Sequence, residues 1–193
     1  MTTPGRGGHG ERRAVFLDRD GTVARYREYC CRVEEFELLP DVGKAIQRLN
    51  QAGLPVIIVT NQSAIGRGWL TTETLEAIHD KMRRELARSG ARVDAIYVCP
   101  HRPDEGCACR KPRSAMLQRS ASEFRLSLPD SYMVGDRQLD MLSGRAVGSR
   151  TVLVRTGHQP EADGAAQADY SAETLEDAVR WILGDRRKPH GTD

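Results

Sequence analysis

Short runs of apolar residues alternate along this chain with segments in which apolar residues recur at helical spacing. Five runs of three or four residues fit buried strands, and they cover residues 14–17, 56–59, 95–98, 132–134 and 151–154. These runs are apolar throughout instead of alternating with polar residues. This pattern favours a parallel sheet that is covered on both faces.

Helical spacing is clearest in the segments between these runs and near the C-terminus. Apolar residues recur three or four positions apart over 42–49, 75–86 and 175–183, and Thr174 is a typical start signal for the last of these helices. Weaker patterns predict helices around 115–124 and 139–146. The alternation predicts an α/β fold with a doubly wound, mostly parallel sheet, in which ligands bind beyond the carboxyl ends of the strands.

Length and composition limit the alternatives. A chain of 193 residues fits one domain without room for a large cap; we place the folded domain at 13–184, with flexible tails at 1–12 and 185–193. No apolar stretch approaches the ~20 residues that span a bilayer, and the N-terminus lacks the apolar core of a secretory signal. We therefore expect a soluble, cytoplasmic protein without a membrane partner, and we expect a monomer.

The charge balance argues against a nucleic-acid partner. The formal net charge is only +2, and the two Trp, five Tyr and three Phe are scattered. The chain therefore has neither the overall positive field nor the stacking surface of a typical nucleic-acid binder. Any recognition of phosphate must be local.

Polar and charged residues follow each of four consecutive predicted strands. They are Asp18 and Asp20 after the first, Thr60, Asn61, Gln62 and Ser63 after the second, Arg110 and Lys111 after the third, and Asp136 and Asp140 after the fourth. Each group alone fits an ordinary turn, cap or surface charge pair. Together they meet the requirements of phosphoryl transfer at one edge of the sheet.

The residue types suggest a role for each position. Asp18 would attack phosphorus, and Asp20 would protonate the departing oxygen and then accept a proton from water. Mg²⁺, which prefers oxygen ligands, would link Asp18 and Asp136 to a phosphate oxygen. Thr60 and Lys111 would hold the other phosphate oxygens as charge redistributes.

A second group of residues has the composition of a zinc site. Cys99, His101, Cys107 and Cys109 lie within eleven residues, which is enough for one closed Cys₃His site. Unrelated buried thiols or a disulfide are the alternatives, and the tight spacing disfavours them. Four protein ligands leave no open position, so the predicted zinc is structural. It would order the loop that leads into Arg110 and Lys111.

The order of these motifs resembles the haloacid dehalogenase superfamily of aspartyl phosphatases. The matching positions are Asp18-x-Asp20-Gly21-Thr22, then Thr60, Lys111 and Gly135-Asp136. The resemblance implies a Rossmann-like fold, with Asp18 as nucleophile and Mg²⁺ ligand, Asp20 as acid/base with its main-chain carbonyl on the metal, and Asp136 as a further Mg²⁺ ligand. It gives Asp140 a supporting role.

The zinc loop followed by Cys109-Arg110-Lys111-Pro112 is similar to the group of D-glycero-D-manno-heptose-1,7-bisphosphate 7-phosphatases and to histidinol-phosphate phosphatases. The segment 60–68 looks more like the heptose group. The resemblance implies that Arg110 recognises the distal phosphate or sugar. It also implies a pocket lined by Tyr26, Arg27, Glu28, Tyr29 and residues 60–63.

The chain departs from the heptose pattern at several positions, including Ala24, Glu28, Ser114 and Ala115. The favoured substrate is a small phosphorylated sugar, the heptose 1,7-bisphosphate. Histidinol phosphate and another small sugar phosphate are alternative substrates. A non-catalytic binding protein that retains the fold is the alternative from a different class, although a binder has no need of both a nucleophile and a proton donor.

Overall fold

Six parallel strands form one sheet in the computed structural model, which describes residues 12–157 and 168–185. The strand order is β3-β2-β1-β4-β5-β6. The strands are β1 (Val15–Leu17), β2 (Val56–Asn61), β3 (Ala95–Cys99), β4 (Tyr132–Gly135), β5 (Arg150–Val154) and β6 (Tyr170–Ala172). The predicted doubly wound fold is confirmed. The sequence pattern does not reveal β6, because this strand has three residues and only Ala172 is buried.

The helices connect these strands. They are α1 (Val42–Gln51), α2 (Ser63–Gly66), α3 (Thr72–Arg88), α4 (Ala115–Phe124), α5 (Gln138–Arg145) and α7 (Leu175–Gly184), with short 3-10 turns η1 (Val33–Glu35) and η2 (Pro103–Glu105). Each predicted helix is present. Thr174 caps α7 as expected, because its hydroxyl accepts a hydrogen bond from the Asp177 amide. Helix α2 is too short for a helical period to show in the sequence.

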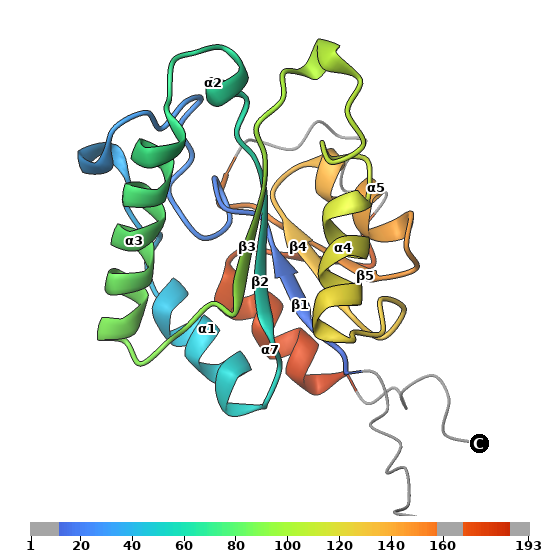
Figure 1. The fold of residues 1–193 in the computed structure, drawn as a ribbon. Coiled ribbons are helices and arrows are strands. Elements are labelled where there is room, and N and C mark those ends of the chain that lie inside the picture. The colour runs from blue at the N-terminus through green and yellow to red at the C-terminus, as the bar shows by residue number, and fades with distance from the viewer. Residues whose placement is uncertain (1–11, 158–167, 186–193) are drawn as a thin grey trace, which may run out of the picture.

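Alternate residues of the strands face two hydrophobic clusters. In and just before β1, Val15 and Leu17 belong to the larger cluster, whereas Ala14 and Phe16 belong to the smaller one. Helices α1, α3 and α7 contribute to the larger cluster and α4 to the smaller. Figure 1 shows α1 and α3 on one side of the sheet and α4 and α5 on the other. Both faces are buried, which explains why the strands are apolar throughout.

The order of the strands reverses between β1 and β4. The chain runs from β1 outward through β2 and β3, and then returns to β4 on the opposite side of β1. The Asp18 amide, just beyond β1, donates to the Val134 carbonyl of β4. In open α/β sheets the crevice at such a reversal is the usual ligand site. Asp18 and Asp136 therefore leave the sheet at this crevice.

The described residues contain no large inserted cap between the strands, as the length predicts. None of their helices is both long and apolar enough to cross a bilayer. Of the predicted tails, residues 1–11 and 186–193 lie outside the described part. At the inner edges of the tails, Arg12 forms a bridge with Leu126, and the Asp185 carboxylate accepts from Tyr132 Oη at 2.7 Å. The domain bounds remain a prediction.

Candidate active site

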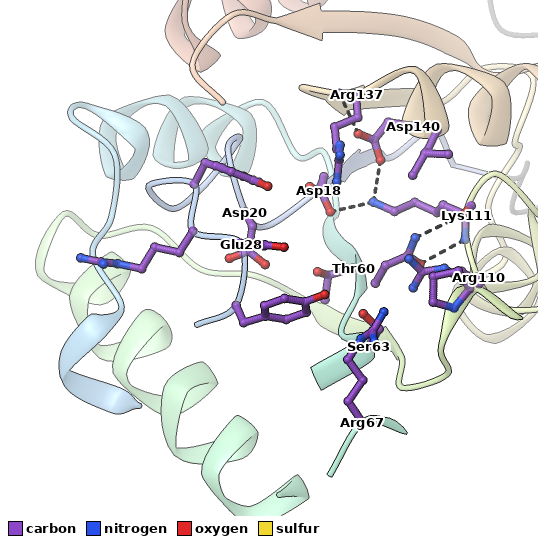
Figure 2. Close-up of a pocket in the computed structure, with 16 residues that line it drawn as sticks. Asp18, Asp20, Glu28, Thr60, Ser63, Arg67, Arg110, Lys111, Arg137 and Asp140 are labelled. Atoms are coloured by element: carbon purple, nitrogen blue, oxygen red, sulfur yellow. Dashed lines mark hydrogen bonds and ion pairs between the residues drawn. The ribbon is translucent and has the colours of Figure 1, made fainter. Parts of the chain in front are cut away.

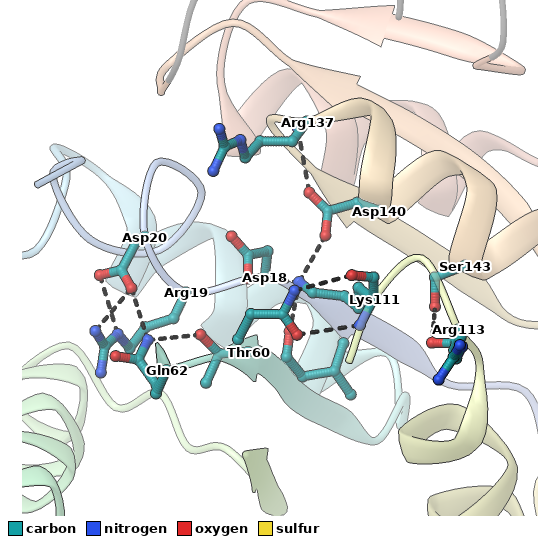
Figure 3. Close-up of polar contacts among 12 residues, drawn as sticks. Asp18, Arg19, Asp20, Thr60, Gln62, Lys111, Arg113, Arg137, Asp140 and Ser143 are labelled. Carbon is teal, nitrogen blue, oxygen red and sulfur yellow. Dashed lines mark hydrogen bonds and ion pairs between the residues drawn. The ribbon is translucent and has the colours of Figure 1, made fainter. Parts of the chain in front are cut away.

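A buried lysine links two carboxylates at the carboxyl edge of the sheet. Lys111 Nζ lies 2.6 Å from Asp18 Oδ1 and 2.6 Å from Asp140 Oδ1, and it also donates to the Val59 carbonyl at 2.8 Å. Figure 3 shows the ammonium of Lys111 between the two carboxylates. Asn61 fixes the backbone of Lys111 through two hydrogen bonds of 3.1 Å. The lysine is thus held by side chain and main chain together.

Burial and neighbouring charges set the protonation of this pair. Burial raises the pKa of Asp18 to about 6, although Lys111 opposes the rise. For Lys111, burial disfavours the charge, but the attraction of Asp140 and Asp18 outweighs burial and raises its pKa above the ordinary value. Lys111 is therefore cationic at neutral pH, and it stabilises the ionised form of the nearby nucleophile candidate.

Asp136 lies against the same group of carboxylates. Asp18, Asp136 and Asp140 each have a carboxylate oxygen that lies within 4.8 Å of such an oxygen in the other two residues. Two glycines make room for Asp136, since a Cβ on Gly21 or Gly157 would come within 2.3 or 2.0 Å of Asp136 Oδ2. Three buried carboxylates at this spacing form the kind of oxygen site that suits Mg²⁺.

A second set of polar contacts surrounds Asp20. Its carboxylate accepts two hydrogen bonds from Arg19, at 3.0 and 2.7 Å, and one from Gln62 Nε2 at 2.8 Å. The same Gln62 nitrogen donates to Thr60 Oγ1 at 2.9 Å. Figure 3 shows that hydrogen bonds join the side chains of Arg19, Asp20, Gln62 and Thr60 in one continuous series. The acid/base candidate and the hydroxyl candidate are therefore held in a fixed relation.

These groups open into a cavity of ≈ 260 Å³ (Figure 2). Most of the predicted catalytic and substrate-binding residues line it: Asp18, Asp20, Tyr26, Arg27, Glu28, Tyr29, Thr60, Asn61, Ser63, Arg110 and Lys111. Two predicted residues do not line the cavity: Gln62 and the metal-ligand candidate Asp136 are 5% and 0% exposed. Four further residues line the cavity without a role predicted from the sequence: Arg67, Pro103, Arg137 and Leu139.

Among these additional residues, Arg67 lies against two aromatic rings. Its Cζ lies 5.9 Å from the ring centre of Tyr29 and 5.2 Å from that of Trp69, and the two rings meet edge to face. No hydrogen bond of its guanidinium is present within 12–157 and 168–185. Cation–π contacts of this kind orient an arginine while its N–H groups stay available. A sequence signal for a role of Arg67 in the cavity exists: it lies between Gly66 and Gly68, only four positions after the predicted pocket residue Ser63.

The four predicted zinc ligands converge on one point. Five of the distances between their nearest sulfur and nitrogen atoms are 3.1–3.6 Å, with His101 facing the cysteines through Nδ1. Zinc bonds of about 2.0–2.3 Å in a tetrahedron require ligand atoms about 3.3–3.8 Å apart. Cys99, His101, Cys107 and Cys109 can therefore hold one zinc ion without rearrangement of the backbone.

The loop that carries these ligands contacts the cavity directly. The Arg110 guanidinium donates to the His101 carbonyl at 3.2 Å. On the other side, the Gly66 amide at the end of α2 donates to the Pro100 carbonyl at 2.9 Å, which ties the turn before Arg67 to the same loop. Two cations of the cavity wall, Arg67 and Arg110, are thus positioned by segments that hold each other.

Comparison with known proteins agrees with this geometry. The family model described as HAD-hydrolase-like matches residues 108–178. A D-glycero-beta-D-manno-heptose-1,7-bisphosphate 7-phosphatase from Haemophilus ducreyi is 36% identical over 179 residues, which cover 89% of this chain and 98% of that protein. This chain belongs to that phosphatase family. The predicted membership of the haloacid dehalogenase superfamily is therefore confirmed, and with it the predicted class of phosphoric monoester hydrolase.

Other members of the family extend the agreement. The heptose-bisphosphate phosphatase of Yersinia pestis is 40% identical over 88% of this chain and 94% of its own length. The crystal structure of D,D-heptose 1,7-bisphosphate phosphatase from B. bronchiseptica, complexed with magnesium and phosphate, superposes with a TM-score of 0.83 at 38% identity. That match covers 89% of this chain and 98% of the other. The similarity therefore spans the whole fold.

Proposed function

We propose that this protein is a Mg²⁺-dependent phosphatase that removes the 7-phosphate of D-glycero-D-manno-heptose 1,7-bisphosphate through a phosphoaspartyl intermediate. The observation that carries the proposal is the buried group at the carboxyl edge, where Lys111 Nζ lies 2.6 Å from Asp18 and the carboxylates of Asp136 and Asp140 lie close by. Whole-length relatives with that activity in their names support the choice of substrate.

The donor groups in the site fit the two proposed metals. Asp18 and Asp136, with the main-chain carbonyl of Asp20, would hold Mg²⁺, and the space that Gly21 and Gly157 leave around Asp136 is consistent with this. Bound Mg²⁺ supplies the positive charge that lets a carboxylate approach an anionic phosphate ester. The Cys₃His group would hold Zn²⁺ as a closed structural site.

The side chains of this chain can carry both halves of the reaction. An oxygen of Asp18 bonds to phosphorus while the bond from phosphorus to the sugar oxygen breaks, and the sugar oxygen takes a proton from Asp20. Asp20 then accepts a proton from water as the water oxygen attacks the phosphoaspartate, which releases inorganic phosphate and restores Asp18. Lys111 and Thr60 contact the phosphate oxygens during both steps.

Recognition of a bisphosphate requires positive charge away from the reacting phosphorus. Arg110 and Arg67 line the cavity from the zinc loop and from the turn after α2, and Figure 2 shows both among the lining side chains. Arginine side chains bind phosphate through paired N–H groups. We assign the second phosphate, the one that is not cleaved, to this pair of arginines.

The test measures phosphate release with Mg²⁺ from three compounds: heptose 1,7-bisphosphate, heptose 7-phosphate and histidinol phosphate. Wild-type protein is expected to prefer the bisphosphate. Arg110→Ala should lower kcat/KM for the bisphosphate by about 10–100-fold, because a charge-assisted contact is lost, and should change kcat/KM for the 7-phosphate little. Arg67→Ala should act in the same direction.

The matched control is Arg25→Ala, since Arg25 pairs with Glu37 on the surface and does not line the cavity. This variant should behave as wild type with all three compounds. Preference of the wild-type protein for histidinol phosphate would contradict the proposed substrate while leaving the phosphatase chemistry in place. Equal losses of Arg110→Ala on both sugar phosphates would contradict the assigned role of the arginines.

A further inference from the structure

Arg19 lies beneath the cavity as a completely buried cation. Its side chain is 0% exposed, whereas the side chain of its partner Asp20 is 20% exposed and lines the cavity. Nε and Nη2 of Arg19 both donate to Asp20, while Nη1 has no hydrogen-bond partner among residues 12–157 and 168–185. A buried guanidinium is strongly destabilised without a counter-charge. Its burial therefore favours the conformation of Asp20 in which both contacts are kept.

The other ionisable groups near Arg19 do not offer an equivalent partner. His79 is buried close by, and burial, followed by the charge of Arg19, lowers its pKa to about 4. The imidazole is therefore neutral at physiological pH. In the described part of the chain, Asp20 is the carboxylate that hydrogen-bonds Arg19. Arg19 and Asp20 are thus each other's ionic hydrogen-bond partners in the described part of the chain.

Gln62, which follows the neighbouring strand β2, completes the contacts around Asp20. It is 5% exposed, and its Nε2 donates to Asp20 Oδ2 and to Thr60 Oγ1. Its own backbone amide donates to the Cys99 carbonyl at 2.8 Å. Gln62 therefore sits behind the reacting groups and connects two of them to the end of β3.

The three donated hydrogen bonds are divided unequally between the two oxygens of Asp20. Oδ2 accepts from both Arg19 Nη2 and Gln62, which uses both of its lone pairs, whereas Arg19 Nε is the one donor to Oδ1 among the described residues. One lone pair of Oδ1 thus remains to carry a proton. Arg19 and Gln62 together select the oxygen at which Asp20 exchanges protons.

We propose that Arg19 and Gln62 are positioning residues that orient Asp20 so that Oδ1 delivers the proton to the departing oxygen; this inference rests on the proposed phosphatase function. As the bond from phosphorus to the leaving oxygen breaks, its electron pair goes to that oxygen, which takes the proton from Oδ1. In the second step Oδ1 accepts a proton from the attacking water. The charge of Arg19 stays on Arg19 throughout.

Two esters that differ in the basicity of the leaving group test this inference without depending on the sugar. Phenyl phosphate needs more help from an acid than p-nitrophenyl phosphate, whose leaving group departs readily without a proton. Arg19→Lys should lower kcat/KM, which reports the step in which the leaving group departs, by about 10–100-fold for phenyl phosphate, a fraction of the usual contribution of general acid catalysis. It should lower kcat/KM for p-nitrophenyl phosphate by less than about threefold. The kcat values are not the readout, because attack of water on the phosphoaspartate is common to both esters and also uses Oδ1 of Asp20.

Gln62→Leu provides a second variant that keeps the volume of the side chain and should show the same dependence on the leaving group. Asn61→Ala is the matched contrast, since Asn61 holds the backbone of Lys111 and not Asp20. It should lower kcat/KM for both esters equally. In an Asp20→Asn background, Arg19→Lys should add no further loss that depends on the leaving group, because the two residues act as a unit. Zinc content and circular dichroism confirm folding.

Equal losses of kcat/KM on both esters in Arg19→Lys and Gln62→Leu, or no loss in either, would overturn the inference and assign these residues a structural role. That result differs from failure of the proposed function. The function fails if the wild-type protein releases no phosphate from the esters or from sugar bisphosphates with Mg²⁺, or if Asp18→Asn remains active. Asp20→Asn must itself show the dependence on the leaving group for the assignment of the proton to stand.

Discussion

The molecule contains two polar sites that are built in opposite ways. The catalytic edge consists of Asp18, Lys111, Asp136 and Asp140. It draws its residues from the segments that follow β1, β3 and β4, which lie up to 122 positions apart in the sequence. The proposed zinc loop, residues 99–109, draws its four candidate ligands from eleven consecutive residues. The first site exists because the sheet brings distant residues together, whereas the second is defined by local spacing.

The two sites also differ in how deeply their residues are buried. Each residue of the catalytic edge is at most 7% exposed, and the strands behind it are fully covered. In the zinc loop only Cys99 is buried, and residues 102–106 are exposed. The loop has little apolar surface to order it, so its conformation depends on its ligand cluster. We therefore expect damage to the catalytic edge to leave the zinc loop intact, whereas loss of zinc should disturb the side chains of the cavity wall that follow the loop.

The largest expected effect is the loss of activity in Asp18→Asn. Without a nucleophilic carboxylate, phosphate release should fall by about 10⁴-fold or more, as in other enzymes that lose the attacking group. Steady-state phosphate release with Mg²⁺ measures the change. Zinc content per chain should equal that of the wild type, and loss of zinc in Asp18→Asn would show that the two sites are not independent.

Removal of zinc should have a smaller effect, because it displaces side chains of the cavity wall and leaves the nucleophile in place. Cys107→Ser, or chelation of zinc, is expected to lower kcat/KM by about 10–100-fold, the usual result of a displacement of about 1 Å near the reacting groups. The KM for the bisphosphate should rise more than kcat falls, since Arg110 contacts the loop through the His101 carbonyl.

Cys30→Ser serves as the control for this prediction, since Cys30 is a buried thiol outside the zinc loop. Zinc measured by elemental analysis should fall in Cys107→Ser alone. Full activity of a preparation shown to contain no zinc would mean that Arg110 and Lys111 keep their positions without the metal. The loop would then be an independent feature of the fold and no support for the cavity.

A methyl group at Gly157 should weaken the catalytic edge without reaching the zinc loop. The added Cβ would lie 2.0 Å from Asp136 Oδ2, so the carboxylate must move. Overpacking of this kind costs about 1–3 kcal/mol, and we expect the Mg²⁺ concentration for half-maximal activity to rise by about tenfold or more. Gly184→Ala is the matched control, because nothing lies within 4 Å of its added Cβ. An unchanged Mg²⁺ requirement in Gly157→Ala would argue against Asp136 as a ligand.

The sequence predicts the fold well where burial imposes a pattern. The five predicted strands and the helices on their faces follow from apolar periodicity, because each element packs against a large core. The pattern does not predict β6 or α2, because three or four residues are too few to show a period. Short elements of this kind are fixed by their neighbours and not by their own composition.

The candidate site shows the same limit at the level of side chains. Positions after parallel strands explain why four predicted residues gather at one edge of the sheet: Asp18, Thr60, Lys111 and Asp136. The direction in which each side chain points does not. Gln62 belongs to a run of polar residues that the sequence assigns to substrate, yet it turns inward to Asp20 and Thr60. Neither the buried position of Arg19 nor the stacking of Arg67 leaves a periodic signal.

The smallest expected effect concerns stability in acid. Its measurement distinguishes a contribution of the sheet core from one of the zinc loop. His79 in α3 is 0% exposed, its ring nitrogens have no hydrogen-bond partner in the described residues, and burial lowers its pKa from 6.5 to about 4. Between pH 6.5 and pH 4, His79 is protonated in the unfolded chain and neutral in the native state. The free energy of unfolding therefore falls as the pH drops from about 6.5 to 4, by at most about 3 kcal/mol.

His79→Leu should remove this part of the acid sensitivity and leave stability at pH 7 unchanged or higher. Denaturant unfolding at pH 7, 6 and 5 measures the difference, with zinc release followed in the same samples. The cysteine ligands also lose zinc as they are protonated, so acid weakens the zinc loop in both proteins alike. If wild type and His79→Leu lose stability in parallel, the acid sensitivity belongs to the zinc loop. If the curves diverge only below pH 6.5, the buried imidazole in the core is its source.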